Sequence, residues 1–308
     1  MFVNCGGEKT TTNPEDNLLH QFSFGHEGEV LLSSAMFSAM DRQNSIFISE
    51  HHHHKVLEFN LDGKFVREIG RMGSGPGEFI YPGELDVEGD QLYLQDFGNL
   101  RLTVFDLEQN QSTMIVQENS LLGFQVHQGY FYGFNMLNGL QGVSELGEEL
   151  IHVYNSDWER IREFGTFISL EEDMVARFSE PMFKIQNDLI HVVFNYFPIY
   201  RVYNTSGELL NEMDLTELLE LDEPDGNYNE NVYKDAFSTG AGLLFRAIDV
   251  YENRVFIARH SPNIRIDEYH LDETDYNLTY KKTWTFNGVG ERYFVYNFFY
   301  QGRYCCSI

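Results

Sequence analysis

The sequence predicts an all-β fold built from one repeated unit, and three observations support this. A short pattern that ends in an aromatic residue recurs along the chain, with the aromatics at Phe59, Phe105, Tyr154, Tyr203 and Tyr269. The intervals between them are 46, 49, 49 and 66 residues, near the roughly 40–50 residues of a propeller blade. Helix signals are scarce, with a capping box that begins a short helix over 169–177 and a second candidate over 216–221. Together these observations predict a β-propeller.

Each unit carries signals for four short strands. In the second unit, two β-like runs over 84–87 and 91–95 are separated by a turn at 88–90. The aromatic pattern supplies the third strand. In the first unit a polar turn at 61–63 then leads to an alternating run over 65–69, which is the pattern of a hairpin. Four antiparallel strands per unit, repeated around a ring, make the blades of a propeller.

Six innermost strands are expected, beginning near Ala35, Glu84, Gly123, Met182, Leu243 and Phe294. We therefore predict a six-bladed β-propeller of four-stranded antiparallel blades over residues 18–308, behind a flexible tether over 1–17. The last blade is expected to combine C-terminal strands at 293–299 and 303–308 with an N-terminal outer strand at 18–24, which removes a free sheet edge. By this count the blade lacks one strand, so either it has three strands or the chain stops short of its natural end.

The most specific pattern lies between residues 69 and 106. The loop Ile69-Gly-Arg-Met-Gly-Ser-Gly-Pro-Gly-Glu-Phe79 precedes Pro82, and a strand ending at Asp96, a Gly-Asn turn and the strand Arg101-Leu-Thr-Val-Phe105 follow. This pattern resembles an NHL-type repeat. The whole chain is similar to the six-bladed propeller lipoproteins abundant in Bacteroidota. The resemblance implies the fold more than an activity, because NHL-like propellers include RNA binders, lyases, scaffolds and sensors.

Charge and motif content narrow the functions that such a fold can carry. Lys and Arg number 21 and Asp and Glu number 48, which gives a net charge of −27 at pH 7. This charge argues against a nucleic-acid partner and against docking to anionic lipid headgroups. No run of about 18 apolar residues is present, so no transmembrane segment is expected. No nucleophile or zinc-protease motif occurs, and no catalytic residue is assigned.

The expected ligand-binding residues lie in loops between the second and third strands of the blades. These loops share one end of the ring, the top face, with the blade-to-blade connectors. The residues are His51, His52, His53, His54, Asp96, Asn99, Asn195, Tyr196, Arg259 and His260. Exposed aromatic and arginine side chains on a concave face are typical binding anchors.

Two metal sites are considered, one in the histidine loop and one in an insertion between blades. Alternate imidazoles such as His51 and His53 suit a transition metal such as zinc, whereas the same histidine run also fits a solvated or blade-packing loop. The acidic loop at 222–230 has oxygen ligands for calcium at alternate positions but departs from the EF-hand pattern, which favours a solvated insertion between blades over a calcium site.

Three basic residues, Lys55, Arg101 and Arg265, each precede their aromatic by four positions. Such a register predicts a structural ion pair, with a carboxylate of a neighbouring blade as one candidate partner. A role in ligand binding is the alternative.

A cysteine near the N-terminus gives an indication of the cellular location of the protein. Cys5 stands before two glycines and a polar linker, which resembles the processed edge of a bacterial lipoprotein signal. Only four residues precede it, whereas a signal needs an apolar region of about 7–15 residues. Either the true start lies upstream or Cys5 is incidental. We expect lipidation at Cys5 and an extracytoplasmic location, as a membrane-anchored lipoprotein or in the periplasm.

These observations favour a non-enzymatic binding module of the cell envelope that needs no cofactor. Its top face would recognise a peptide, a glycan or a partner protein. The alternative is a metal-dependent lyase or hydrolase with calcium or zinc in the central channel, and a purely structural scaffold is a third reading. The sequence leaves the ligand and the oligomeric state open.

Overall fold

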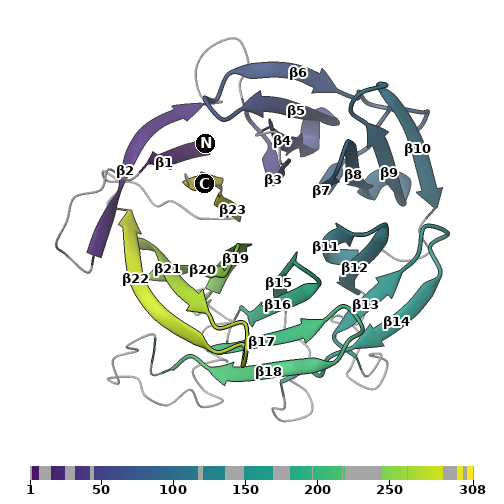
Figure 1. Ribbon diagram of the computed structural model, residues 1–308. Helices are drawn as coiled ribbons and strands as arrows, with labels where there is room; N and C mark the ends of the chain where they lie inside the picture. The colour runs from purple at the N-terminus through teal and green to yellow at the C-terminus, as the bar shows by residue number, and fades with distance from the viewer. Residues whose placement is uncertain are drawn as a thin grey trace, which may run out of the picture.

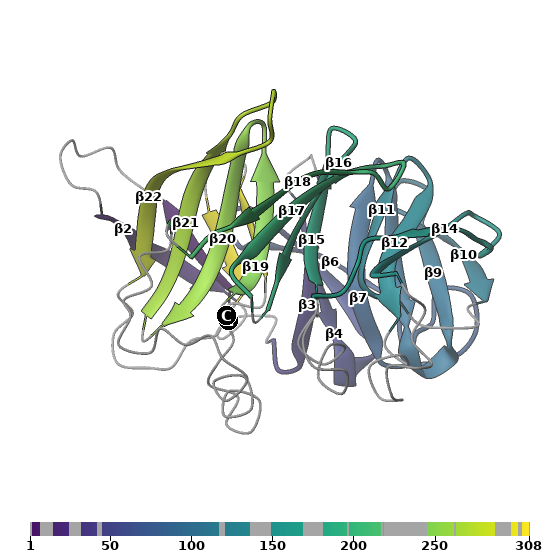
Figure 2. The same cartoon turned by 90° about the horizontal axis from the view of Figure 1, so that it is seen from below.

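The computed structural model describes residues 2–6, 15–24, 32–41, 45–116, 121–135, 149–168, 181–195, 197–216, 218, 245–261, 263–286, 297–300 and 304–307. In these residues the strands form blades around a central axis (Figure 1). The first strand of each blade lies nearest the axis and the fourth lies at the rim. Seen from the side, the strands run between the two ends of the ring, so their loops gather on two opposite faces (Figure 2).

Five blades follow one another in sequence, each a four-stranded antiparallel unit. Blade 1 contains β3 (Ala35–Met40), β4 (Ser45–Glu50), β5 (Lys55–Asn60) and β6 (Phe65–Ile69). Blade 2 contains β7 (Pro82–Glu88), β8 (Gln91–Asp96), β9 (Arg101–Asp106) and β10 (Gln111–Val116). Blade 3 contains β11 (Leu121–His127), β12 (Tyr130–Asn135), β13 (Ile151–Tyr154) and β14 (Arg160–Phe164).

Blade 4 contains β15 (Pro181–Gln186), β16 (Leu189–Phe194), β17 (Ile199–Asn204) and β18 (Leu209–Asp214). Blade 5 contains β19 (Phe245–Tyr251), β20 (Arg254–Ser261), β21 (Asn263–Leu271) and β22 (Leu278–Phe286). Two short 3-10 helices, η1 (His51–His53) and η2 (Phe97–Asn99), occupy the loops between the second and third strands of blades 1 and 2.

A sixth four-stranded unit joins the two ends of the chain. The hairpin of β23 (Asn297–Tyr300) and β24 (Tyr304–Ser307) pairs through β24 with β1 (Phe2–Gly6), and β1 pairs with β2 (Glu15–Phe24). Strand β2 also pairs in parallel with β22, so this unit and blade 5 share one eight-stranded sheet.

Strand β1 is the one that the sequence-based count lacked. It lies within the segment 1–17 that was expected to form a tether, and β2 begins within that segment too. The sequence pattern missed β1 because the strand is short and its partner β24 lies at the other end of the chain.

The predicted inner strands agree with the observed ones. Strands β3, β7, β11, β15, β19 and β23 begin within three residues of the expected positions. The helix expected over 169–177 lies outside the described residues, and so does the one over 216–221 apart from Thr216 and Leu218.

The recurring pattern has a structural cause. Its aromatics, Phe59, Phe105, Tyr154, Tyr203 and Tyr269, are at most 8% exposed and belong to the hydrophobic core. The polar residue after the aromatic then caps the next turn. In blade 1, for example, Asn60 Oδ1 accepts hydrogen bonds from the backbone N–H groups of Asp62 and Lys64, and Asn155 and Asn204 serve their blades in the same way.

Candidate functional site

The loops of blades 1 and 2 at the top face share one backbone structure. Glu50 and Asp96 end the second strands of their blades, and η1 and η2 follow. His54 and Leu100 then adopt left-handed conformations, with φ of 57° and 51°. The repeat therefore places His53 where blade 2 has Asn99.

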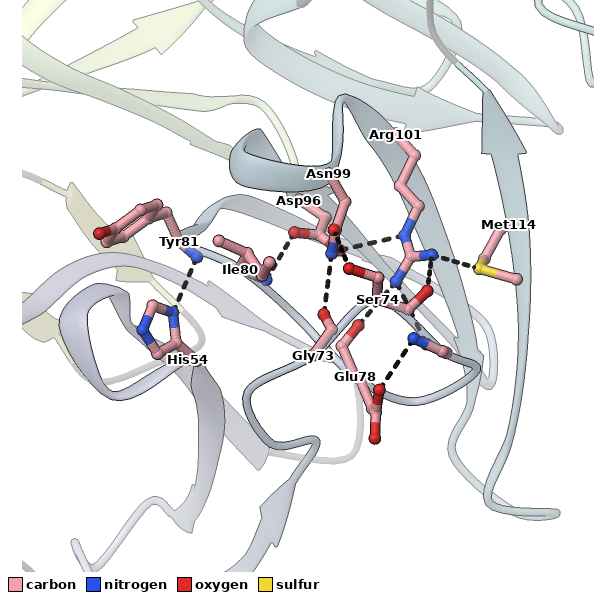
Figure 3. Close-up of polar contacts among 11 residues, drawn as sticks. His54, Gly73, Ser74, Glu78, Ile80, Tyr81, Asp96, Asn99, Arg101 and Met114 are labelled. Carbon is pink, nitrogen blue, oxygen red and sulfur yellow. Dashed lines mark hydrogen bonds and ion pairs between the residues drawn. The ribbon is translucent and has the colours of Figure 1, made fainter.

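In blade 2, this loop is tied to the glycine-rich connector by Asp96. The buried carboxylate of Asp96 accepts hydrogen bonds from the Ile80 backbone N–H (2.8 Å), from Asn99 Nδ2 (2.6 Å) and from Arg101 Nε (3.1 Å) (Figure 3). Asn99 also donates to the Gly73 carbonyl oxygen. Asp96 and Asn99, both expected to bind ligand, thus use their polar atoms to hold the loop and the connector together.

Arg101 completes this arrangement. Its guanidinium group donates to the carbonyl oxygens of Ser74, Gly75 and Glu78 in the connector (Figure 3). The predicted ion pair of Arg101 is confirmed, but its carboxylate partner Asp96 lies in the same blade and not in a neighbouring one. Figure 3 shows a connector fixed by side chains rather than a free loop.

Blade 1 uses a different set of residues for the same purpose. The buried carboxylate of Glu50 accepts hydrogen bonds from the backbone N–H groups of Ser33 and Ser34 and lies 2.8 Å from His53 Nδ1. His53 thus takes the structural role of Asn99. The rest of the His53 imidazole faces the solvent, since more than half of the side chain is exposed.

The other three histidines surround one tyrosine. The ring centroids of His51, His52 and His54 lie 5.2, 6.2 and 5.0 Å from that of Tyr81. His54 Nδ1 accepts a hydrogen bond from the Tyr81 backbone N–H at 3.0 Å (Figure 3), and His51 Nδ1 donates to the Pro82 carbonyl oxygen at 3.1 Å. We call His51, His52, His54 and Tyr81 the Tyr81 cluster.

The Tyr81 cluster lies in a region where apolar side chains are exposed. Among the described residues, the large exposed hydrophobics at the top ends of blades 1 and 2 are Met36, Met72, Tyr81 and Leu100. The other such residues are dispersed, mostly one per rim strand: Val66, Met114, Tyr130, Ile161, Leu209 and Tyr280. Tyr81 and Leu100 also have left-handed backbones, with φ of 55° and 51°. That conformation costs a non-glycine residue roughly 1–2 kcal/mol.

The remaining expected site residues lie elsewhere on the ring. The Asn195 carbonyl oxygen accepts a hydrogen bond from the Phe245 backbone N–H, and Arg259 forms an ion pair with Asp267. His260 lies in β20, whereas Tyr196 lies outside the described residues. Blade 3 on one side and the sixth unit on the other separate blades 4 and 5 from the Tyr81 cluster (Figure 1). The structure therefore does not bring the two groups of residues together.

Within the described part of the chain, no group of three or more His, Cys, Asp or Glu side chains is arranged to hold a metal ion. The acidic loop at 222–230 lies outside that part. No helix among the described residues has the length and apolar character needed to cross a membrane.

The inner strands contain a feature that the sequence analysis did not identify. Glu84 of β7 accepts hydrogen bonds from the backbone N–H groups of Gly123 and Phe124 in β11, and Asp86 accepts one from Val126. Burial raises the pKa of Glu84 to about 7 and that of Asp86 to about 6. The hydrogen bonds from β11 act in the opposite direction and offset part of this rise. The carboxylates thus link blades 2 and 3. The sequence signal was the placement of acidic residues at every second position of a strand.

A family model described as a 6-bladed beta-propeller matches residues 37–260. No curated protein is significantly similar to the chain in sequence.

Several solved structures have the same architecture at low sequence identity. A Bacteroides fragilis protein named as a candidate exported protein is 15% identical, with a TM-score of 0.52, over 93% of this chain and 75% of that one. The WD40 repeats of RRP9 are 9% identical, with a TM-score of 0.53, over 90% and 73% of the two chains. A Bacteroides uniformis protein named as a candidate 6-phosphogluconolactonase is 8% identical, with a TM-score of 0.51, over 96% and 84%. At these identities the likeness shows the fold alone.

Proposed function

This chain belongs to the 6-bladed beta-propeller family, and on that premise we propose that it is a non-enzymatic binding module of the cell envelope. Its ligand is a peptide, a glycan or a partner protein, bound at the top face of blades 1 and 2. The observation that carries the proposal is the Tyr81 cluster, in which an exposed aromatic ring is bordered by three imidazoles.

The cluster has the properties of a binding anchor. Tyr81 keeps 44% of its surface exposed although its backbone is held in a left-handed conformation. Strained residues that persist in a structure are concentrated at functional sites. Tyrosine offers a large contact area with few rotatable bonds, so that little conformational entropy is lost on binding.

Hydrogen bonds hold the loops that support the Tyr81 cluster. His54 Nδ1 accepts from the Tyr81 backbone N–H, and His51 donates to the carbonyl oxygen of the following residue, Pro82. On the other side of Tyr81, the Asp96 carboxylate accepts from the backbone N–H of Ile80. A fixed scaffold reduces the entropy that a ligand must overcome, which favours affinity.

The imidazoles add hydrogen-bonding capacity beside the ring. His54 Nδ1 accepts a hydrogen bond, so in the neutral ring the proton lies on Nε2, which can donate to a ligand. His51 Nδ1 donates to a carbonyl oxygen, so its Nε2 carries a lone pair that can accept. One donor and one acceptor beside an aromatic face suit the hydroxyl groups of a glycan or the amides of a peptide.

Binding is tested with glycan and peptide arrays probed with the wild-type protein and Tyr81→Ala. Loss of a central aromatic anchor costs about 2 kcal/mol or more, so the affinity for the wild type's best ligand should fall roughly thirtyfold. Tyr130→Ala is the matched control, because Tyr130 is 42% exposed and lies at the opposite face, beside the turn between β11 and β12. Equal binding by wild type and Tyr81→Ala would contradict the proposed site.

Metal analysis separates this proposal from a metal-dependent enzyme. The purified protein is compared with a variant in which His51 to His54 are all alanine. We expect no stoichiometric metal in either. Stoichiometric metal in the wild type that is lost from the variant would refute the non-enzymatic proposal.

An envelope location is the second part of the proposal. It is supported by the resemblance to envelope lipoproteins and by the candidate exported protein of similar fold. Lipid attachment at Cys5, which lies in β1, belongs to this part. Mass spectrometry of protein from the membrane fraction should find a lipid-modified Cys5. An unmodified mass would contradict attachment there.

A further inference from the structure

A comparison of the blades identifies a charge reversal in blade 5. The third-strand residue four positions before the buried aromatic is basic in blades 1, 2 and 5, and it pairs across the sheet with a residue of the second strand. The pairs are Glu50 with Lys55, Asp96 with Arg101, and Arg259 with Arg265. Blade 5 thus has an arginine where the other two blades have a carboxylate.

Asp267, two residues after Arg265 on the same strand, is already paired with Arg259. Both Asp267 oxygens contact the Arg259 guanidinium group, with Nη2 at 3.0 Å from Oδ1. Oδ1 also accepts a hydrogen bond from the Thr283 hydroxyl at 2.5 Å. Asp267 is completely buried, so it has no accessible oxygen left for a second cation.

Arg265 differs from its counterparts in the other blades. Lys55 pairs with Glu68 at 2.6 Å, and Arg101 has Asp96 and three carbonyl oxygens as acceptors. Among the described residues, no ion pair involves Arg265, and its buried Nε has no hydrogen-bond acceptor. The side chain is only half-buried, so it is accessible from the solvent.

This arrangement is costly unless an anion compensates for it. Like charges directly opposite each other in a sheet are destabilising, and a desolvated guanidinium N–H without an acceptor adds to the cost. The chain as a whole has a net charge of −27, so an unpaired cation in this position is unusual. We propose that the top end of blade 5 binds an oxyanion, the carboxylate, sulfate or phosphate group of a ligand, through the Arg265 guanidinium group.

The chemistry of arginine suits this role. Its planar guanidinium group presents N–H donors in a fork that matches two oxygens of a carboxylate or phosphate group. Arg259, held by Asp267, supports the adjacent strand and does not need to contact the anion. The site is independent of the Tyr81 cluster because it belongs to another blade and to other residues.

Thermal unfolding in sodium phosphate, sulfate or acetate, each against sodium chloride of equal ionic strength, tests the proposal. A ligand that binds only the folded state raises the melting temperature with its concentration. At least one of the three anions should stabilise the wild type saturably. Arg265→Gln should lower the affinity for that anion roughly tenfold or more, as expected for the loss of a charged hydrogen-bonding group. Arg265→Lys should retain part of the response.

Two controls separate the possible outcomes. Arg160→Gln removes a surface arginine from β14 and should leave the response unchanged, and Tyr81→Ala should do the same, since the two sites are separate. An equal response in the wild type and Arg265→Gln would overturn the proposal, as would a wild type that responds to none of the anions. If Arg265→Gln fails to fold, titration of the wild type with each of the three anions, followed through the arginine Nε–H resonances by NMR, gives the answer. A saturable shift of the Arg265 resonance with at least one anion supports the site, and the absence of a shift with all three overturns it.

Discussion

Replacing Arg101 with alanine should destabilise the protein far more than replacing Lys55, although the two residues occupy the same position of the repeat. Both begin the third strand of a blade, four residues before the buried aromatic, and both form an ion pair. They differ in burial. The Asp96 partner of Arg101 is fully buried, whereas Glu68, the partner of Lys55, is 47% exposed.

The magnitudes follow from this difference. Arg101→Ala leaves a buried carboxylate without its cation, which costs about 3–5 kcal/mol. Asp96 would keep its hydrogen bonds from Ile80 and Asn99, so we expect the lower end, about 3 kcal/mol. The three connector carbonyls lie near the surface and can bind water instead. Lys55→Ala breaks an exposed pair, which contributes about 0–1 kcal/mol.

Urea-induced unfolding at neutral pH measures both free energies, with the fluorescence of the buried Trp158 as one probe and far-ultraviolet circular dichroism as the other. The two losses should differ by about 2 kcal/mol or more. Should Arg101→Ala cost about the same as Lys55→Ala, the buried contact between Arg101 and Asp96 would not be what holds the connector. The same variant should also weaken ligand binding at Tyr81, because the connector that carries this residue loses its clamp.

The remaining predictions concern packing and pH. Gly98→Ala should cost about 1–3 kcal/mol, because a Cβ would overlap the side chain and carbonyl group of Ile80. At Gly89 a Cβ would contact no neighbouring atom, so Gly89→Ala only places an alanine in a left-handed conformation, and its free energy of unfolding should fall by about 1 kcal/mol. Urea denaturation measures both variants, and a larger loss for Gly89→Ala than for Gly98→Ala would contradict this reasoning. The pKa of Glu84 rises from 4.5 to about 7 on folding, so the folded state holds more protons and this residue's contribution to stability falls as pH rises through that range. The free energy of unfolding of the wild type, measured relative to that of Glu84→Gln, should therefore fall between pH 4.5 and about 7. If the difference between the two proteins is the same at all pH values in this range, the pKa shift is refuted. Burial lowers the pKa of His191 from 6.5 to about 4, so the contribution of this residue to stability is lost as pH falls through that range. The free energy of unfolding of the wild type should therefore fall there relative to that of His191→Gln.

Much of the fold could be predicted because its signals are local. Alternation along a strand, a polar residue that caps the next turn and a buried aromatic all act within a few residues. For this reason Phe59 and Asn60 identify a blade as well in the sequence as in the structure. The glycine loop before Pro82 was identified for the same reason. Strand β1 was missed because its signal is not local, since Phe2 pairs with Ser307.

The candidate sites depend on contacts between distant residues. The sequence identified the histidine run but not its centre, Tyr81, which follows His54 by 27 positions and contacts it only after β6 and the connector fold back. Asp96 and Asn99 had the residue types of a binding site, yet both are used to hold the connector.

The sequence by itself determined a ring of four-stranded β units, their approximate boundaries and a strongly acidic chain, because strand period, turn chemistry and charge are properties of neighbouring residues. Only the tertiary structure decided which repeated side chains are structural and which remain available. Arg101 and Arg265 occupy the same position of the repeat, yet one is surrounded by acceptors and the other faces Arg259. The reason is physical: the energy of a charged group depends on its burial and on the charge beside it, and folding across the chain sets both.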